Sequence, residues 1–211
     1  VDCGTLAHEP IAAAGCDVVV LDHHQGGETL PAAVAVVNPN RQDEERHLSY
    51  LCAAGVVFML LVATNRLMRQ AGREGPDLLS ALDLVALATI ADVAPLHGLN
   101  RAFVRAGLAV MAQGLRPGLA ALAEVSRLSG PPGVHALGFV FGPRINSGGR
   151  IGAADLGARL LATDDPHEAA MLAEKLDAFN GTRKDVEAAV RAAAEAQVEA
   201  RGTDGPLVWA A

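Results

Sequence analysis

The sequence is poor in aromatic residues, in cysteine and in positive charge, and each shortage excludes a class of protein. Aromatic residues make up 3% of the 211 residues, so Ala, Val and Leu have to fill the core. The three cysteines, Cys3, Cys16 and Cys52, form neither a disulfide framework nor a zinc pattern, which favours small buried side chains in a reducing compartment. The formal net charge of −7 argues against a simple nucleic-acid-binding module, because such modules are usually basic. An enzyme whose metal ions carry the positive charge tolerates that balance.

Long hydrophobic runs are also missing. The longest apolar run, residues 53–63, contains Gly55 and is too short to span a bilayer. No signal peptide is visible. We therefore expect a globular, cytoplasmic protein that does not associate with membranes, and we expect a monomer.

Two buried strands with a helix before the first indicate an α/β fold. Residues 17–21 and 33–37 are continuous runs rich in Val, typical of strands buried on both faces. Residues 5–14 read as a helix with Thr5 as a possible cap. Helices between buried strands predict a parallel sheet with flanking helices. The second strand ends at Asn38-Pro39-Asn40, a turn signal.

The rest of the chain is predicted to be mainly helical. We expect helices over residues 49–70, 78–91 with Asp77 as its cap, 99–113, 119–128 and 166–200, separated by Gly- and Pro-containing breaks. Apolar residues of the last helix fall close to one stripe, which is typical of a helix that packs on its own domain or bridges two domains. The stripe contains Leu172, Leu176, Phe179, Val186, Val190 and Ala193.

Asp22-His23-His24 is the strongest candidate for chemistry. The triplet directly follows the first buried strand, and ligand sites in open parallel sheets lie at the carboxyl ends of strands. Asp2 would end the preceding, neighbouring strand if Val1 is the last residue of that strand. Carboxylate and imidazole groups that meet there suit Mn²⁺ or a similar ion. The alternative is a turn cap or a hydrogen-bonded loop without metal.

Asp92 and a glycine-rich segment are further candidates. Asp92 follows an apolar helix, where the helix dipole disfavours a carboxylate unless a bound cation compensates the charge. The alternative, which the local sequence supports equally, is a solvated carboxylate in a loop. Residues 142–152 hold four glycines, Arg144 and Arg150, and Asn146 offers a side-chain donor. Glycine backbone and guanidinium groups together favour phosphate binding, and the alternative is a mobile glycine-rich connection.

Taken in order, these motifs resemble the DHH phosphoesterase superfamily, and within it the single-stranded-DNA-specific exonucleases. The resemblance covers nearly the whole chain. It rests on the segments Val1-Asp2-Cys3-Gly4, Leu21-Asp22-His23-His24, Val37-Asn38-Pro39-Asn40, Leu51-Cys52-Ala53-Ala54-Gly55-Val56, Ala88-Thr89-Ile90-Ala91-Asp92-Val93 and Gly142-Pro143-Arg144-Ile145-Asn146.

The resemblance implies metal-dependent hydrolysis of phosphodiesters with two Mn²⁺ or Mg²⁺ ions in the complete enzyme. It implies that Asp2, His23 and Asp92 bind metal, that His24 faces the substrate phosphate, and that Asp22 orients an imidazole. A second group, Arg144 and Asn146 with Arg150 nearby, would hold the nucleic acid. The implied activity is stepwise release of 5′-mononucleotides from the 5′ end of single-stranded DNA, in repair and recombination.

The superfamily's first Asp-rich motif would precede Val1, so three direct ligands are too few for two octahedral sites, and the chain is expected to be a fragment. The expected divisions are a catalytic domain over residues 1–165, a connector helix over 166–203 and the start of an associated domain over 204–211. The alternatives are a DHH enzyme that cleaves oligoribonucleotides or other small phosphoesters, and a metal-free scaffold.

Overall fold

The chain folds into two compact units, and each is described by itself. The computed structural model describes residues 1–201 and Trp209. Unit 1 comprises Val1–Leu115 and Ser129–Gly142, and unit 2 comprises Arg116–Leu128 together with the described residues from Pro143 onward. Every predicted metal ligand lies in unit 1, whereas Arg144, Asn146 and Arg150 lie in unit 2.

Unit 1 begins with a small parallel sheet. Strand β1 (Val19–Leu21) pairs in parallel with β2 (Ala35–Val37), and Val20 lies opposite Val36. Helix α1 (His8–Ala13) precedes β1, and the Asp2 backbone N–H donates to Leu21 O at 2.8 Å, on β1. The chain just before α1 therefore lies at the carboxyl end of β1, where the triplet begins. This arrangement confirms the predicted α/β fold with a parallel sheet.

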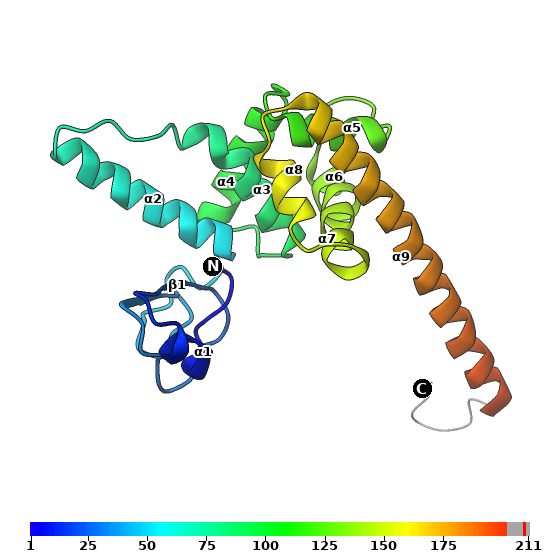
Figure 1. The fold of residues 1–211 in the computed structure, drawn as a ribbon, viewed down its shortest axis with the longest axis horizontal. Helices are drawn as coiled ribbons and strands as arrows, with labels where there is room; N and C mark the ends of the chain where they lie inside the picture. Colours follow the sequence, from blue (N-terminus) through cyan, green and yellow to red (C-terminus); the bar gives the residue numbers. More distant parts are fainter. Residues whose placement is uncertain (202–208, 210–211) are drawn as a thin grey trace. The chain divides into compact units, whose positions relative to one another are not determined.

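Helix α3 lies at the centre of the helical part of unit 1. Helix α2 (Ala53–Gln70), the short turn η1 (Leu79–Ala81), α3 (Leu82–Ala91) and α4 (Gly98–Met111) follow one another, and α6 (Val134–Ala136) leads into the π-helical turn η2 (Leu137–Phe141). Helix α3 packs against α2, α4 and η2 (Figure 1). Apart from Asp83 and Thr89 its sequence is apolar, as expected of a helix surrounded by other elements. Phe58 of α2 and Phe103 of α4 meet edge to face in the adjoining core.

Unit 2 consists of helices that pack on the first half of α9. Helices α5 (Pro117–Val125) and α8 (Leu156–Ala162) contact α9 (Pro166–Arg201), whose buried residues all lie before residue 181. Val186 and Val190, further along the predicted apolar stripe, are exposed. Only the first half of that stripe therefore contributes to the core of unit 2.

Several sequence-based expectations are wrong in detail. Helix α1 begins at His8, and Thr5 is a buried polar residue rather than its cap. Val19 is exposed, so β1 is not buried on both faces. The second predicted helix begins at Ala53 instead of residue 49, because residues 47–50 form a turn.

The glycine-rich segment is helical, which corrects the expected open loop. Helix α7 (Gly142–Ile151) continues directly from η2, so its glycines do not form a phosphate-binding loop. They permit close packing instead: a Cβ on Gly148 would lie 2.9 Å from Leu176 Cδ2 of α9, and one on Gly152 would lie 2.3 Å from Phe179 Cε2.

The predicted division at residues 165 and 203 stays a prediction. Most of the expected third segment, residues 204–211, lies outside the described residues. Among the described helices, none combines the length and the apolar character needed to cross a membrane.

Candidate metal centre

His23 lies between two carboxylates at the carboxyl end of β1. Its Nε2 is 3.1 Å from Asp2 Oδ1, and its Nδ1 is 3.7 Å from Asp92 Oδ2. The His23 side chain is largely buried, whereas both carboxylates are substantially exposed. Three segments far apart in the sequence thus converge: the start of the chain, the end of β1 and the end of α3.

Backbone geometry contributes to this convergence. Asp2 has a left-handed backbone conformation with φ 63°, which few non-glycine residues adopt. Asp92 is the C-cap of α3, and the next residue, Val93, is also left-handed with φ 58°. The left-handed conformation is strained for the β-branched Val93, and both turns carry a carboxylate to His23.

His24 is held by Asp22. His24 Nδ1 lies 2.8 Å from Asp22 Oδ1, and its ring is 61% exposed. The rings of His23 and His24 are 4.5 Å apart between centroids. One potential ligand atom each from Asp2, His23 and His24 falls within a 4.8 Å group, so His24 can also reach an ion bound there.

Asp22 is buried, and its hydrogen bonds keep it ionised. Burial by itself opposes the charge, but donors from Thr5 and His24 outweigh it and hold the pKa of Asp22 far below its usual range. The backbone N–H groups of Thr5, His23 and His24 all donate to this carboxylate, at 3.0, 2.8 and 3.2 Å. Because Asp22 accepts, the hydrogen bond raises the pKa of His24 and places its proton on Nδ1, leaving Nε2 for another partner.

The Asn38-Pro39-Asn40 turn supports the triplet from behind, a role that the sequence did not reveal. Asn38 Nδ2 donates to Thr5 Oγ1 and to His24 O, both at 2.8 Å. Asn40 Nδ2 donates to His23 O at 2.6 Å. Both asparagines are buried, and each holds the carbonyl of one histidine. Their polar character within a buried turn was the only sequence signal for this role.

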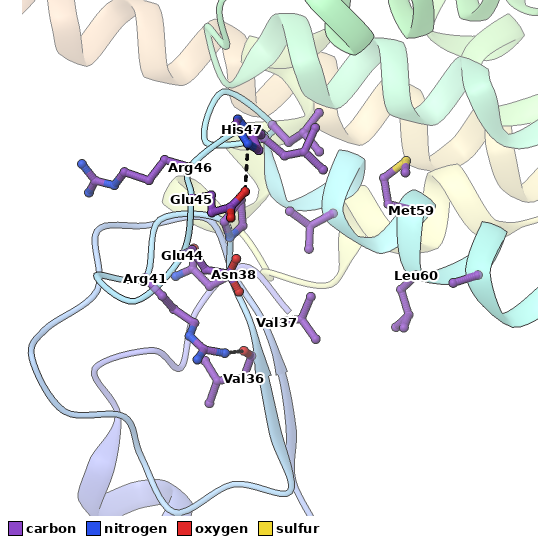
Figure 2. A pocket seen from close by; sticks show the side chains of 15 residues that line it. Val36, Val37, Asn38, Arg41, Glu44, Glu45, Arg46, His47, Met59 and Leu60 are labelled. Carbon is purple, nitrogen blue, oxygen red and sulfur yellow. Dashed lines mark hydrogen bonds and ion pairs between the residues drawn. The ribbon is translucent and has the colours of Figure 1, made fainter.

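A separate pocket of about 600 Å³ lies beside this support (Figure 2). Apolar side chains of α2, including Met59 and Leu60, line one side, and the charged loop after β2 lines the other. Arg41 donates to Val36 O, and His47 pairs with Glu45. None of the residues Asp2, Asp22, His24 and Asp92 lines this pocket, which is therefore separate from the cluster around His23.

The predicted substrate-binding residues all belong to α7 in unit 2. Arg144 is mostly buried and forms an ion pair with Asp177 of α9 at 2.8 Å. Asn146 and Arg150 are exposed. The structure thus joins the predicted metal ligands into one cluster and describes the predicted phosphate-binding residues within the other unit.

Comparisons with known proteins agree with the resemblance. Residues 1–89 match the DHH family, N-terminal domain. The chain is 42% identical to the single-stranded-DNA-specific exonuclease RecJ of Salmonella typhimurium over 206 residues, which cover 92% of this chain and 36% of that protein. The chain spans about a third of the length of the curated relatives that it matches.

Solved structures match as well. A crystal structure of exonuclease RecJ bound to manganese superimposes with a TM-score of 0.77 at 38% identity, covering 90% of this chain and 48% of that one. A structure of RecJ from Thermus thermophilus in complex with Mg²⁺ gives a TM-score of 0.59 at 39% identity, covering 68% of this chain and 22% of that one.

Proposed function

This chain is related to the DHH phosphoesterases, and to the RecJ exonucleases among them, and we propose that it catalyses metal-dependent hydrolysis of single-stranded DNA. The activity is stepwise removal of 5′-mononucleotides from the 5′ end. The observation that carries the proposal is the approach of Asp2 and Asp92 to the two ring nitrogens of His23, beside a His24 that Asp22 holds.

The donor set fits a divalent cation. Asp2, His23 and Asp92 would hold Mn²⁺ or Mg²⁺, because carboxylate oxygen and imidazole nitrogen suit these ions. The cation would compensate the negative charge of the two carboxylates that face the His23 ring. Because both carboxylates are exposed, there is room beside them for a substrate phosphate. When bound, the cation supplies charge neutralisation at the phosphodiester and lowers the pKa of a water molecule.

His24 and Asp22 act on the phosphate together. The Asp22 carboxylate fixes the His24 ring through Nδ1, so Nε2 can contact a phosphoryl oxygen or the ion. The raised pKa of His24 favours its charged form, which stabilises negative charge that develops on the phosphoryl group. Asn38 and Asn40 hold the backbone of this pair and of His23 without touching the substrate.

We further propose that Arg144, Asn146 and Arg150 bind the nucleic-acid backbone. Arg150 and Asn146 are exposed on α7 and can donate to phosphate oxygens. Arg144 already pairs with Asp177, so it would share its donors between that carboxylate and a phosphate. In the same proposal the protein is a cytoplasmic monomer in DNA repair and recombination, and α9 connects residues 1–165 to a further domain.

The test is a nuclease assay with Mn²⁺ on single-stranded DNA labelled at either end. It is run on the 211-residue chain and on the chain joined to any segments encoded beside it, since the relatives are longer. We expect labelled mononucleotide at once from the 5′-labelled strand and progressively shortened strands from the 3′-labelled one. Asp92→Asn should lower the rate on the order of a hundred-fold or more.

Asp164→Asn is the matched control, because Asp164 is an exposed carboxylate of unit 2 and is not one of the predicted ligands. It should leave the rate unchanged. Fast cleavage of di- or trinucleotides without attack on longer DNA would replace this proposal with an oligonucleotidase. Failure to take up Mn²⁺ in either form would indicate a metal-free scaffold.

A further inference from the structure

Phe139 is an exposed aromatic residue in a chain that has few. The residue is 74% exposed, although the chain contains only five Phe, one Tyr and one Trp. The neighbouring Leu137 and Phe141 of the same turn η2 are completely buried. The turn therefore has a well-packed inner side, and Phe139 projects from its outer side without contributing to the core.

The Phe139 ring has a defined partner. His135 stacks on it, with ring centroids 5.0 Å apart and an angle of 27° between the planes. Both residues are exposed, and the stacked pair lies on α6 and η2. π-Helical turns such as η2 occur frequently at functional sites.

The turn η2 is anchored next to a predicted metal ligand. A Cβ on Gly138 would lie 3.3 Å from Ile90 Cγ2, and one on Gly142 would lie 3.2 Å from Ala91 Cβ. Ile90 and Ala91 form the last turn of α3, and Asp92 follows them. The stacked rings are thus carried by a segment that packs against the end of α3.

Two arginines of α4 line a pocket that extends to the start of α6 and to the segment after Asp92. Arg101 and Arg105, one turn apart on α4, line a pocket of about 500 Å³ with Leu96 and Val134. Val134 directly precedes His135, and Leu96 lies in the segment that follows Asp92. Both arginines are exposed, and neither has a carboxylate partner within residues 1–201 or at Trp209. In an acidic chain, two uncompensated guanidinium groups favour an anionic ligand.

We propose that Phe139 and His135 form a stacking platform for one unpaired base of single-stranded DNA, and that Arg101 and Arg105 bind the phosphates beside it. This inference rests on the proposed function and adds a substrate-binding surface to it. Aromatic faces with neighbouring arginines are the usual means of holding single strands without sequence preference. In a duplex the faces of the bases are already stacked, so such a platform selects unpaired DNA.

The test is equilibrium binding of fluorescent single-stranded oligonucleotides in buffer with Ca²⁺ in place of Mn²⁺. Phe139→Ala and Phe139→Leu should each weaken binding by about five- to a hundred-fold, since leucine keeps apolar volume but has no aromatic face. Phe139→Tyr should bind like the wild type. Leu67→Ala removes another exposed apolar side chain of unit 1 and is the matched control.

Oligonucleotides with a single abasic site locate the stacked base. The wild type should bind more weakly when the abasic site occupies one particular position, and Phe139→Ala should show no further weakening at that position. The double variant Arg101→Gln/Arg105→Gln should bind with a weaker salt dependence. The negative slope of log K against log salt should become less steep by about 0.7 for each phosphate that the variant no longer neutralises.

The outcomes separate the two proposals. Single-stranded DNA binding by the wild type that Phe139→Ala leaves unchanged overturns the platform and not the proposed function. Equal weakening at every abasic position also overturns it, because a platform acts on one base. Absence of any binding to single-stranded DNA by the wild type overturns both.

Discussion

At the scale of single residues, Asp22 and Asn38 determine where the two histidines lie. Asp22 accepts hydrogen bonds from three backbone N–H groups and from the His24 ring, and Asn38 joins the carbonyl of His24 to Thr5. Both side chains belong to residues that are 2% exposed, so water cannot replace these bonds. The predicted metal ligand His23 is thus positioned by neighbours that never reach the ion.

Replacement of Asn38 by alanine should disturb both stability and metal binding. The change leaves Thr5 Oγ1 and the His24 carbonyl without a donor, and we expect a decrease of about 1–3 kcal/mol in the free energy of unfolding. The affinity for Mn²⁺ should fall about ten- to a hundred-fold, as is typical when an outer-shell partner is removed. Thermal unfolding and isothermal titration calorimetry measure the two effects.

Asn65→Ala is the control for this change. Asn65 makes one exposed hydrogen bond, to Pro76 O, far along α2 from the cluster. It should leave the Mn²⁺ affinity unaltered. Equal Mn²⁺ affinities for the Asn38 variant and the wild type would contradict the support role that we assign to the asparagine turn.

At the scale of elements, the position of Asp92 depends on how closely α3 and α4 pack. Gly107 of α4 lies directly against α3: a Cβ there would be 2.1 Å from Leu82 O and 2.5 Å from Ala86 Cβ. A backbone oxygen cannot turn aside as a flexible side chain can. The two helices therefore approach this closely only because residue 107 is glycine.

Gly107→Ala should lower the melting temperature, because it forces α3 away from α4 at a cost of about 1–3 kcal/mol or more. Gly181→Ala is the matched variant: Gly181 is also helical, in α9, and an added Cβ would meet nothing within 4 Å. That change should stabilise the protein by about 0.5–1 kcal/mol. Differential scanning calorimetry of both variants checks the opposite signs, and a neutral Gly107→Ala would refute the packing argument.

The two halves of α9 should respond differently to substitution. Leu176 is completely buried in unit 2, and Leu176→Ala should cost about 2–5 kcal/mol. Val190 is 64% exposed, and Val190→Glu should change the stability by less than about 0.5 kcal/mol. Urea unfolding of the two variants gives both values, and a large destabilisation by Val190→Glu would mean that the second half of α9 is packed in solution.

At the scale of the whole molecule, the sequence predicted those features that local patterns encode. Buried runs predicted parallel strands, and the rule that ligand sites lie at the carboxyl ends of strands predicted that Asp2 would approach the triplet. The roles of Thr5, Asn38 and Asn40 were missed, because they depend on hydrogen bonds between residues up to 33 positions apart. The helical form of residues 142–151 was missed because packing against α9 overrides the low helix propensity of glycine there.

The central claim is that Asp2, His23 and Asp92 are ligands of divalent cations in one metal centre. Anomalous diffraction from a crystal of the protein grown with Mn²⁺ tests it most directly. We predict manganese density in which each of these three residues has a ligand atom about 2.0–2.6 Å from a manganese peak, and weaker density in Asp92→Asn. A peak elsewhere in the chain, or no peak in crystals saturated with Mn²⁺, would contradict the claim.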